Sequence, residues 1–318
     1  MHAVIVNPAS GGGKTARRWT AFAPKLLSRF GPCEVFRSEH PGHCEQLARA
    51  ALEAGAKRIF VVGGDGTNHE VVNGLFDEAG KARAGLNRLS LTFLPMGTGS
   101  DLCRSLGLPR RPETALDVLE DQARPLDLIE VDFQGHNGQA LRRFSVNIAS
   151  FGISGEVGRR LAIGQKNGAL SYPAAVLGAV RSYQNRDCGL TVDGGESRPA
   201  RLLAGVIAKG QFFGGGMRVA PDARLDDGSL SFIELGDLSG AEVLRWLVPL
   251  YRGSHLRSQK ITSSAIRELS VVPLGEAPVE IELDGEPVGQ LPATFRVRHH
   301  ALRVHGAQSG AWSRRSTS

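Results

Sequence analysis

The chemistry of this chain centres on a run of glycines that surrounds one carboxylate. The run reads Gly63-Gly64-Asp65-Gly66-Thr67. Glycines allow positive φ and a close approach to a ligand, because they carry no Cβ atom. A carboxylate without a neighbouring cation is the group that a Mg²⁺–nucleotide site requires. The pattern therefore indicates phosphate chemistry, and the simpler alternative is a plain turn in which Asp65 caps a helix.

The segments on either side of this run predict a strand-to-helix turn. Residues Ile59 to Val62 form a short apolar run bounded by charge, which is typical of a buried strand. The N–H groups at the start of the following helix favour an anion such as phosphate. The helix is predicted from apolar residues that recur at helical spacing, namely Val71, Val72, Leu75 and Phe76.

Two further glycine-rich turns follow predicted strands. Ala3–Val6 leads into the turn 7–15, and Leu89–Leu94 leads into the turn 95–101. The first turn is not a Walker A loop, because Pro8 stands where that motif requires glycine. It still offers N–H groups and the charge of Lys14 to a phosphate, with a flexible turn as the alternative. Ligands of parallel sheets bind at the carboxyl ends of the strands, so three such turns support one another.

Strands and helices alternate up to Pro125, which predicts an N-terminal α/β domain over residues 1–125 with a parallel sheet. Pro24 is expected to kink the first helix. The remaining predicted elements of this half are the amphipathic helix from Trp19 to Phe30, the strand Cys33–Phe36, the helix His43–Ala54 and the helix Glu113–Glu120.

After Pro125 the pattern changes to short alternating strands, which predict an antiparallel β-sandwich domain over residues 126–305. Its last segment is free to return to the first domain. One helical insertion is expected from Gly155 to Tyr183, and a disordered tail over 306–318. The predicted strands are Leu128–Phe133, Arg143–Ile148, Gly189–Val192, Leu202–Ala208, Leu230–Glu234, Glu268–Val272, Val279–Leu283 and Phe295–Val297.

Composition limits the cellular locations and the classes of partner that we expect for this protein. A net charge of +6 and a pI near 9.4 favour nucleotides or an anionic membrane surface as partners. Nucleic acid ranks lowest, because no basic stripe is interleaved with aromatic residues. The sequence has no apolar run of membrane-spanning length and no signal peptide, so we expect a cytoplasmic protein at the inner face of the membrane. Four scattered cysteines indicate reduced thiols rather than a zinc site or disulfides.

Three motifs, taken in chain order, resemble the diacylglycerol kinase catalytic-domain family of bacterial lipid kinases, which is related to the sphingosine and ceramide kinases. The resemblance covers nearly the whole chain. The motifs are Asn7-Pro8-x-Ser10-Gly-Gly-Gly-Lys14, Gly63-Gly64-Asp65-Gly66-Thr67-x-x-Glu70 and Gly97-Thr98-Gly99-Ser100-Asp101. They are followed by Asn147-x-Ala149-x-x-Gly152, Gly214-Gly215-Gly216-Met217, Ala220-Pro221-x-Ala223, Asp227-Gly228 and Asp284-Gly285-Glu286.

The resemblance implies an N-terminal α/β nucleotide domain and a C-terminal β-sandwich, with the active site in the cleft between them. It implies that Asp65 and Asp101 support a catalytic Mg²⁺ and that Glu286 is the general base. Asp127 and Lys166 would join a charged network with the two aspartates. The implied ATP contacts are Asn7, Pro8, Ser10, Gly11, Gly12, Lys14, Ser38, Gly64, Asp65, Gly66, Thr67, Asn68, Glu70 and Thr98.

A second, structural Mg²⁺ is implied at Asp227 with the backbone carbonyls of Arg224 and Ser229. The sequence departs from the family at two positions, since Ser100 stands where asparagine is common and Arg224 stands where a hydroxyl or apolar residue is common. Each of these acidic positions, taken alone, is more simply a turn or a solvated surface group. Asp284-Gly285 in particular is a strong hairpin signal.

We therefore predict an ATP- and Mg²⁺-dependent lipid kinase that converts diacylglycerol to phosphatidic acid, with a homodimer as the candidate assembly. A sphingoid-base or phosphatidylglycerol kinase is a near alternative. NAD kinase shares the turn around Asp65 but not the turn 97–101. A non-catalytic nucleotide-binding regulator is a further alternative. The presence of every expected catalytic carboxylate argues against it.

Overall fold

The computed structural model describes residues 1–163, 171–307 and 311–312, which divide into two compact units. Unit 1 comprises Met1–Leu128, Arg224–Asp227 and Arg298–Ser318. Unit 2 comprises Ile129–Ala223 and Gly228–Val297. The chain therefore passes from unit 1 to unit 2 at residue 128 rather than at residue 125. It contributes two later segments to unit 1, so neither unit is a single continuous stretch of sequence.

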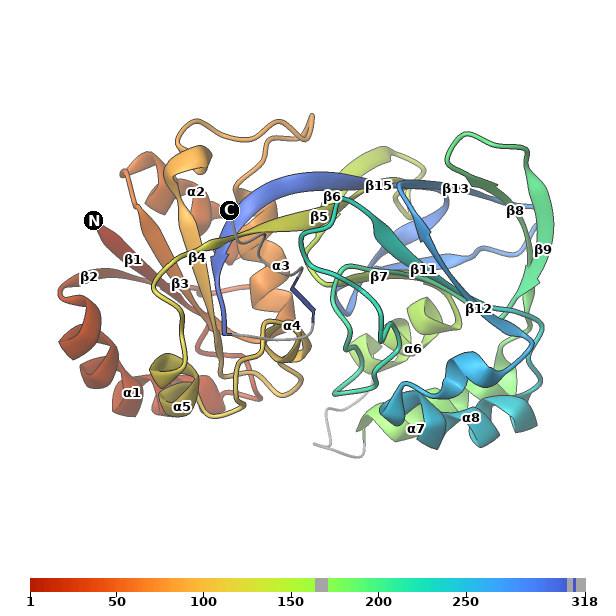
Figure 1. Ribbon diagram of the computed structural model, residues 1–318, viewed down its shortest axis with the longest axis horizontal. Coiled ribbons are helices and arrows are strands. Elements are labelled where there is room, and N and C mark those ends of the chain that lie inside the picture. The colour runs from red at the N-terminus through yellow and green to blue at the C-terminus, as the bar shows by residue number, and fades with distance from the viewer. Residues whose placement is uncertain (164–170, 308–310, 313–318) are drawn as a thin grey trace, which may run out of the picture. The chain divides into compact units, whose positions relative to one another are not determined.

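Unit 1 is built on a parallel sheet, as predicted. Val, Ile and Phe side chains make its inner strands almost continuously apolar and buried, which is the pattern of a sheet covered on both faces. Figure 1 shows these strands side by side in red to orange, with the blue end of β15 beside β4. The strand order is β2 (Cys33–Arg37), β1 (His2–Val6), β3 (Arg58–Gly63), β4 (Ser90–Pro95) and the end of β15 (Glu286–His305).

The longer helices of unit 1 pack in two pairs beside these strands (Figure 1). Helix α1 (Lys14–Phe30) contacts α5 (Pro112–Asp117), and α2 (His43–Glu53) contacts α3 (Asp65–Gly74). The helix predicted at 113–120 is shorter than expected and ends at Asp117, as α5. Two short turns of helix complete this part, η1 (Leu86–Arg88) and α4 (Asp101–Ser105).

Unit 2 is a β-sandwich of antiparallel strands, also as predicted. Its strand order is β12-β11-β10-β7-β14-β15, and β15 also pairs with β13 and β5. Buried side chains from both sets of strands share one apolar core. The strands are β5 (Arg124–Gln134), β6 (Ala140–Ser145), β7 (Ile148–Gly152), β8 (Arg186–Val192), β9 (Arg198–Leu202), β10 (Ala204–Ala208), β11 (Leu230–Leu235), β12 (Ile261–Ile266), β13 (Glu268–Pro273) and β14 (Glu280–Leu283).

Three of the predicted strands are wrong in extent. The strand predicted at 143–148 is two strands, β6 and β7, because the backbone N–H groups between them donate hydrogen bonds to the buried carboxylate of Asp284. The strand predicted at 202–208 breaks at Leu203, where β9 leaves β8 and β10 begins to pair with β7 and β11. The strand predicted at 295–297 is one part of the 20-residue strand β15.

The prediction of a single helical insertion in this half of the chain is incomplete, because it missed one helix. Its described part consists of α6 (Ile153–Ile163) and α7 (Ser171–Ser182), and a further helix, α8 (Gly240–Arg252), was not predicted. Neither were β12 and the turn η3 (His255–Arg257). Helix α8 begins at a Ser239–Glu242 capping box and ends at Gly253, so its start and stop signals are present in the sequence. No helix within the described ranges has the length and apolar character needed to span a bilayer.

The described residues of the tail are ordered against unit 1, which corrects the expectation of disorder for those positions. Ala311 and Trp312 are buried. The N–H of Leu225 donates to the carbonyl of Ala311 at 2.8 Å, and the Arg124 guanidinium lies over the Trp312 ring at 4.5 Å. The remainder of 308–318 lies outside the described residues. This contact explains why Arg224–Asp227 belongs to unit 1.

Candidate active site

Three glycine-rich turns meet at the carboxyl edge of the unit 1 sheet, where the parallel strands place them. The first turn joins the second through Asn7 Nδ2, which donates to Thr67 Oγ1 at 3.1 Å. It joins the third through Thr15 Oγ1, which donates to the carbonyl of Met96 at 3.1 Å. The second and third turns are joined directly, because the N–H of Gly97 donates to the carbonyl of Gly63 at 2.7 Å.

The second and third turns approach so closely that side chains would not fit between them. A Cβ at Gly97 would overlap the Cα of Gly64 and lie 3.0 Å from its nitrogen. A Cβ at Gly63 would fall within the side chain of Thr67. These glycines are therefore required by the packing of backbone on backbone, in addition to any contact with a ligand.

The first turn meets the requirements of a phosphate-binding loop. Gly11, Gly12 and Gly13 have φ values of 62°, 67° and 80°, which residues with a Cβ adopt at a cost. Gly13 begins α1 without a side-chain cap. Within the described residues, the N–H groups of Gly11 and Gly12 donate no hydrogen bond, and Lys14 beside them is exposed. Amides, helix start and ammonium group therefore all favour an anion.

Asp65 and Asp101 border one space at this edge. The Asp65 carboxylate accepts hydrogen bonds of 3.3 Å from the N–H groups of Asp101 and Leu102, at the start of α4. A Cβ at Gly99 would lie 2.8 Å from Asp65 Oδ2 and 3.7 Å from Asp101 Oδ2. Glycine at position 99 thus keeps the space beside both carboxylates open. Paired carboxylate oxygens are the ligands that Mg²⁺ prefers, so these residues fit that ion.

The same two carboxylates set the electrostatics of the buried Cys103. Burial raises the pKa of the Cys103 thiol well above its ordinary value, and the charges of Asp65 and Asp101 raise it further. The thiol therefore stays protonated and is not a nucleophile. A divalent cation bound by the two aspartates would reduce their negative potential at Cys103.

Ser100, one of the two departures from the family pattern, has a left-handed backbone with φ 55° and ψ 40°. Asparagine adopts this conformation more readily than most residues with a Cβ. The common asparagine at this position is therefore explained by the backbone, and serine keeps the same turn with more strain.

Three of the expected ATP contacts are buried or bonded within unit 1. The Glu70 carboxylate accepts from the N–H groups of Gly42 at 2.9 Å and Cys44 at 3.0 Å, so it caps the start of α2. Ser38 is buried beside the Cys44 thiol, and Asn68 is buried in α3. The remaining expected contacts, Pro8, Ser10, Gly66 and Thr98, lie in the three turns themselves.

Asp127 contacts residues that the sequence analysis did not single out. It is fully buried, and its Oδ1 accepts from His299 Nδ1 at 2.9 Å and from the N–H of His300 at 2.8 Å. The ligand atoms of these three residues lie within 4.8 Å of one another, a spacing that could hold a metal ion. These bonds join Asp127 to the end of β15, and Lys166 lies outside the described residues.

The residues expected to hold the second Mg²⁺ are a poor match for it. The Ser229 carbonyl accepts a hydrogen bond of 2.6 Å from Nζ of Lys209, a fully buried lysine. An ammonium group on this oxygen opposes a divalent cation on the same atom. The Arg224 guanidinium is bonded to the carbonyl of Trp312 at 3.0 Å. The bond from Lys209 therefore weighs against the Ser229 carbonyl as a metal ligand, whereas the guanidinium bond of Arg224 does not involve the backbone carbonyl that was expected to bind the ion.

In unit 2, the expected general base stands at a tight hairpin. Asp284 and Gly285 have φ values of 53° and 92°, and Leu283 pairs with Glu286 across them, which gives a two-residue turn. The hairpin signal in the sequence is thus borne out by the backbone. Glu286 is exposed at the start of β15.

Asp284 does more than shape this hairpin. Its buried carboxylate accepts from Ser145 Oγ at 2.7 Å and from three consecutive backbone N–H groups of the β6–β7 connection. These donors are about 140 positions away in sequence. The carboxylate therefore satisfies the amides left without strand partners where β6 ends, and it fixes the hairpin to the neighbouring strand β7. The three amides are those of Val146, Asn147 and Ile148.

Glu282 is a candidate site residue that the sequence analysis missed. It is buried, and its pKa is raised to about 8, first by burial and then by the charges of Glu286 and Asp284. It therefore holds a proton near neutral pH, beside an exposed carboxylate. The signal was available in the spacing, since acidic residues occupy every second position through the hairpin, at Glu282, Asp284 and Glu286.

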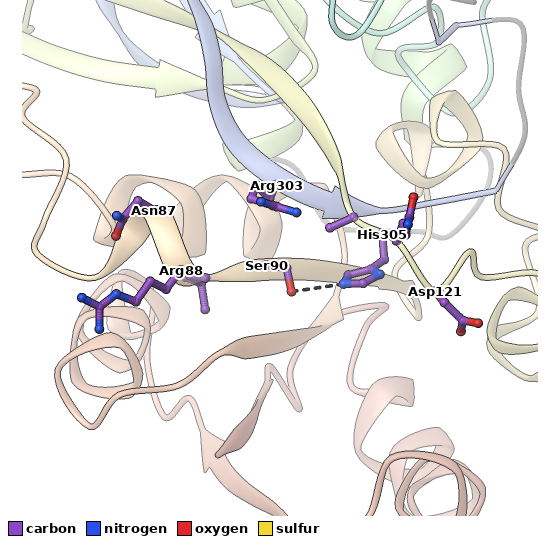
Figure 2. A pocket seen from close by; sticks show the side chains of 9 residues that line it. Asn87, Arg88, Ser90, Asp121, Arg303 and His305 are labelled. Atoms are coloured by element: carbon purple, nitrogen blue, oxygen red, sulfur yellow. Dashed lines mark hydrogen bonds between the residues drawn. The ribbon is translucent and has the colours of Figure 1, made fainter. Parts of the chain in front are cut away.

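A polar hollow of about 630 Å³ lies at the opposite end of β4, near its first residue. Figure 2 shows His305 turned toward Ser90, to whose hydroxyl it is bonded at 3.1 Å. Burial and nearby arginines lower the pKa of His305 to about 4, so the ring is neutral at neutral pH. Arg303 and Asp121 lie apart in the same view, so the charged side chains do not converge as those at the glycine turns do.

Two family models match this chain. The diacylglycerol kinase catalytic domain matches residues 2–131, and the YegS C-terminal NAD kinase beta sandwich-like domain matches residues 147–306. The first covers the three glycine turns, and the second covers the acidic hairpin. Together they follow the same division of chemistry that the two units show.

Curated relatives extend over most of the chain. A diacylglycerol kinase of Bacillus subtilis is 29% identical over 300 residues, which cover 92% of this chain and 91% of the relative. A protein of Pseudomonas aeruginosa named "Probable lipid kinase YegS-like" is 30% identical over 269 residues, which cover 83% and 81%. A solved structure of a diacylglycerol kinase from Bacillus anthracis has a TM-score of 0.68 at 18% identity, and covers 98% of this chain and 97% of that one. This likeness at low identity concerns the fold.

Proposed function

Because this chain belongs to the diacylglycerol kinase family and is a lipid kinase, we propose that it transfers the γ-phosphoryl group of ATP to a hydroxyl of a neutral lipid. Diacylglycerol is the leading acceptor, and phosphatidic acid is the product. The names of the curated relatives support this acceptor. The reaction needs no covalent intermediate with the protein, only positioning and charge stabilisation.

One observation carries the proposal: the three glycine turns are bonded to one another around two carboxylates. The turn 11–13 offers N–H groups and the start of α1 to a phosphate chain. Gly99 leaves room beside Asp65 and Asp101, where a cation that accompanies the phosphates would bind. A turn that served only to connect a strand and a helix would not need this open space between carboxylates.

Each residue of unit 1 has a distinct part in this proposal. The amides of Gly11 and Gly12 and the Lys14 ammonium bind phosphate oxygens. Asp65 and Asp101 hold Mg²⁺, which when bound supplies charge neutralisation at the transferring phosphate. Asn7 acts through Thr67, to which it is bonded, and so keeps the first two turns in register.

Glu286 of unit 2 is proposed as the general base that removes the proton of the lipid hydroxyl. It is exposed, and a carboxylate is a group that can accept this proton. The buried Glu282 precedes the hairpin, and its pKa is raised in part by the charge of Glu286. Asp284 holds the hairpin in place through the bonds to residues 145–148.

The proposal is tested by a thin-layer assay with γ-labelled ATP and a panel of acceptors. The panel contains diacylglycerol, a sphingoid base, phosphatidylglycerol and NAD. We expect label in phosphatidic acid and a requirement for Mg²⁺. Label in a different lipid would change the acceptor and keep the reaction. Label in NADP would identify a NAD kinase, and nucleotide binding without label in any product would identify a regulator.

The nucleotide site is tested by Asp65→Asn, with Asp77→Asn as the control. Asp77 is an aspartate of the same unit whose Oδ1 also accepts a backbone N–H, that of Lys81 at 2.8 Å, but it is exposed and remote from the glycine turns. We expect Asp65→Asn to lower kcat at least about 10³-fold, since it removes charge that holds the cation. A kcat near the wild-type value in Asp65→Asn would remove Asp65 from the site.

A further inference from the structure

Helix α8 of unit 2 presents an apolar face to solvent. The side chains of Leu244, Val248 and Tyr251 are 50%, 61% and 47% exposed. Their spacing of four and then three residues places them on one face of the helix. Exposed apolar residues are ordinary when single, but a row of three along one helix face requires an explanation.

This face is not needed to hold the helix in the unit. The other face packs through Val243, Trp246 and Leu250 onto a buried core formed by neighbouring strands. Figure 1 shows α8 beside α7, with which it is also in contact. One apolar face of the helix therefore packs on unit 2, and the second apolar face is left for a partner outside the described residues.

Positive charge borders the exposed face. At about 100° per residue, Arg245 and Arg252 follow next to Val248 around the helix, and both are exposed. The acidic residue of α8, Glu242, stands in the first turn, where it forms the capping box and pairs with Lys260 at 2.8 Å. Within α8, the flank of the apolar row thus carries arginine and no uncompensated carboxylate.

An apolar row with an arginine flank and an aromatic residue is the pattern of a helix that lies at a membrane interface. With 13 residues, α8 is too short to cross a bilayer. A second copy of the chain fits less well, because a two-fold contact of this face with itself would bring the arginines of the two copies together. The charge instead complements anionic lipid.

We propose that α8 binds the surface of anionic bilayers, with Leu244, Val248 and Tyr251 at the boundary of the acyl chains and with Arg245 and Arg252 on lipid phosphates. The inference rests on the lipid kinase function for its purpose, since the acceptor lipid resides in the membrane. It assigns membrane contact to one face of one helix rather than to the net charge of the chain.

The apolar row is tested with Leu244→Gln/Val248→Gln/Tyr251→Gln, because glutamine keeps helix propensity. The control is Val272→Gln/Leu274→Gln, which removes two apolar side chains, 45% and 56% exposed, elsewhere in unit 2. Sedimentation with vesicles of phosphatidylcholine and phosphatidylglycerol is the measurement. We expect the α8 variant to bind at least about tenfold more weakly, and the control to bind like the wild type.

The charge is tested with Arg245→Gln/Arg252→Gln against a control that removes two exposed arginines from other surfaces, Arg49→Gln/Arg267→Gln. Both variants have the same net charge. An arginine near an anionic surface contributes about fivefold to binding. The variant without the two α8 arginines should therefore bind vesicles roughly 25-fold more weakly than the wild type, and the control variant should lose much less affinity. High salt should reduce the binding of the wild type and narrow the difference.

Three results would overturn the inference. One is equal binding of the wild type to neutral and anionic vesicles, and another is unchanged vesicle binding by the α8 apolar variant. The third is a change from two copies to one in analytical ultracentrifugation with vesicle binding unaltered, which would assign the face to a dimer. Activity on a short-chain diacylglycerol in detergent micelles should stay unchanged in the α8 variants. If the wild type phosphorylates no lipid, the proposed function fails, while the vesicle measurement still decides this inference.

Discussion

The glycine turns of unit 1 and the acidic hairpin of unit 2 prepare for a charged reaction by opposite means. In unit 1 the site is backbone: amides, positive φ and missing Cβ atoms, with Asp65 held by the amides of α4. In unit 2 it is side chain: three carboxylates within five residues, of which the buried Glu282 has a raised pKa. The first arrangement is sensitive to added volume and the second to charge and pH. Substitutions that differ in these two respects should therefore separate the units.

After the loss of Asp65, the largest effect is expected at the exposed carboxylate of the hairpin. Glu286→Gln keeps the shape but cannot accept a proton, so we expect kcat to fall by about 10²–10⁴-fold. ATP binding, measured by calorimetry, should be nearly unchanged, because the glycine turns are intact. A variant that binds ATP weakly and keeps its kcat would make Glu286 a nucleotide ligand, and the base would then have to be sought at Asp127 or Asp101.

The next effect concerns volume in unit 1. Gly97→Ala places a methyl group against the backbone of Gly64 and should lower the free energy of unfolding by about 3 kcal/mol. Gly12→Ala is the matched control, since its φ is also unsuited to alanine but the space around it is open. The control should cost about 1 kcal/mol. Urea unfolding of both variants decides, and equal losses would contradict close packing of the two turns.

The role of charge in unit 2 can be tested by comparing a buried and an exposed aspartate that share the same backbone conformation. Asp284 and Asp193 both have positive φ, both precede glycine and both accept backbone N–H groups. Asp284→Asn places an amide group among buried donors and should cost about 2 kcal/mol of unfolding free energy. Asp193→Asn is exposed and should cost about 0.5 kcal/mol. If thermal unfolding shows the same loss for both, the bonds of Asp284 to residues 145–148 contribute little.

The smallest effect is a change in pH dependence. The folded pKa of Glu282 is about 8, above the ordinary 4.5, so the folded protein keeps a proton that the unfolded chain loses. Its contribution to stability is complete below about pH 4.5 and is lost as the pH rises through about 8. Glu282→Gln should therefore remove about 1 kcal/mol of the decline in unfolding free energy between about pH 7 and pH 8.

The control for this prediction is Glu276→Gln, a change of the same chemistry at an exposed position of unit 2. It should leave the pH profile of unfolding as it is in the wild type. An unchanged profile in Glu282→Gln would mean that Glu282 is ionised in the folded protein. Glu286→Gln should give part of the same change, because the charge of Glu286 contributes to the raised pKa of Glu282.

Local patterns succeeded where neighbours in sequence are also neighbours in space. The apolar run before Gly63 and the helical spacing after it predicted β3 and α3, because each depends on residues a few positions apart. The hairpin at Asp284-Gly285 was predicted for the same reason, since its two positive φ values are a property of those two residues. The gathering of the three turns followed from the parallel order of the strands.

Helix α8 shows a different kind of failure. Its cap at Ser239 and its end at Gly253 are local signals, but its apolar residues lie on two faces rather than one. The single-face pattern that usually indicates a helix is therefore blurred. If the outer face binds a bilayer, as proposed, the residues that obscured the helix are the ones that give it a function.

By itself, the sequence determined the α/β and β-sandwich halves, the glycine turns and the identity of the acidic residues, because these depend on period, turn chemistry and residue type. Only the tertiary structure decided what each carboxylate does. Glu70 caps α2, Asp127 binds the end of β15 and Asp284 holds the amides between β6 and β7. These assignments depend on donors that are 26 to 173 positions away in sequence. A carboxylate looks the same in sequence whether its partner is water, a backbone N–H or a metal ion, and its burial and its pKa are fixed only when distant strands come together.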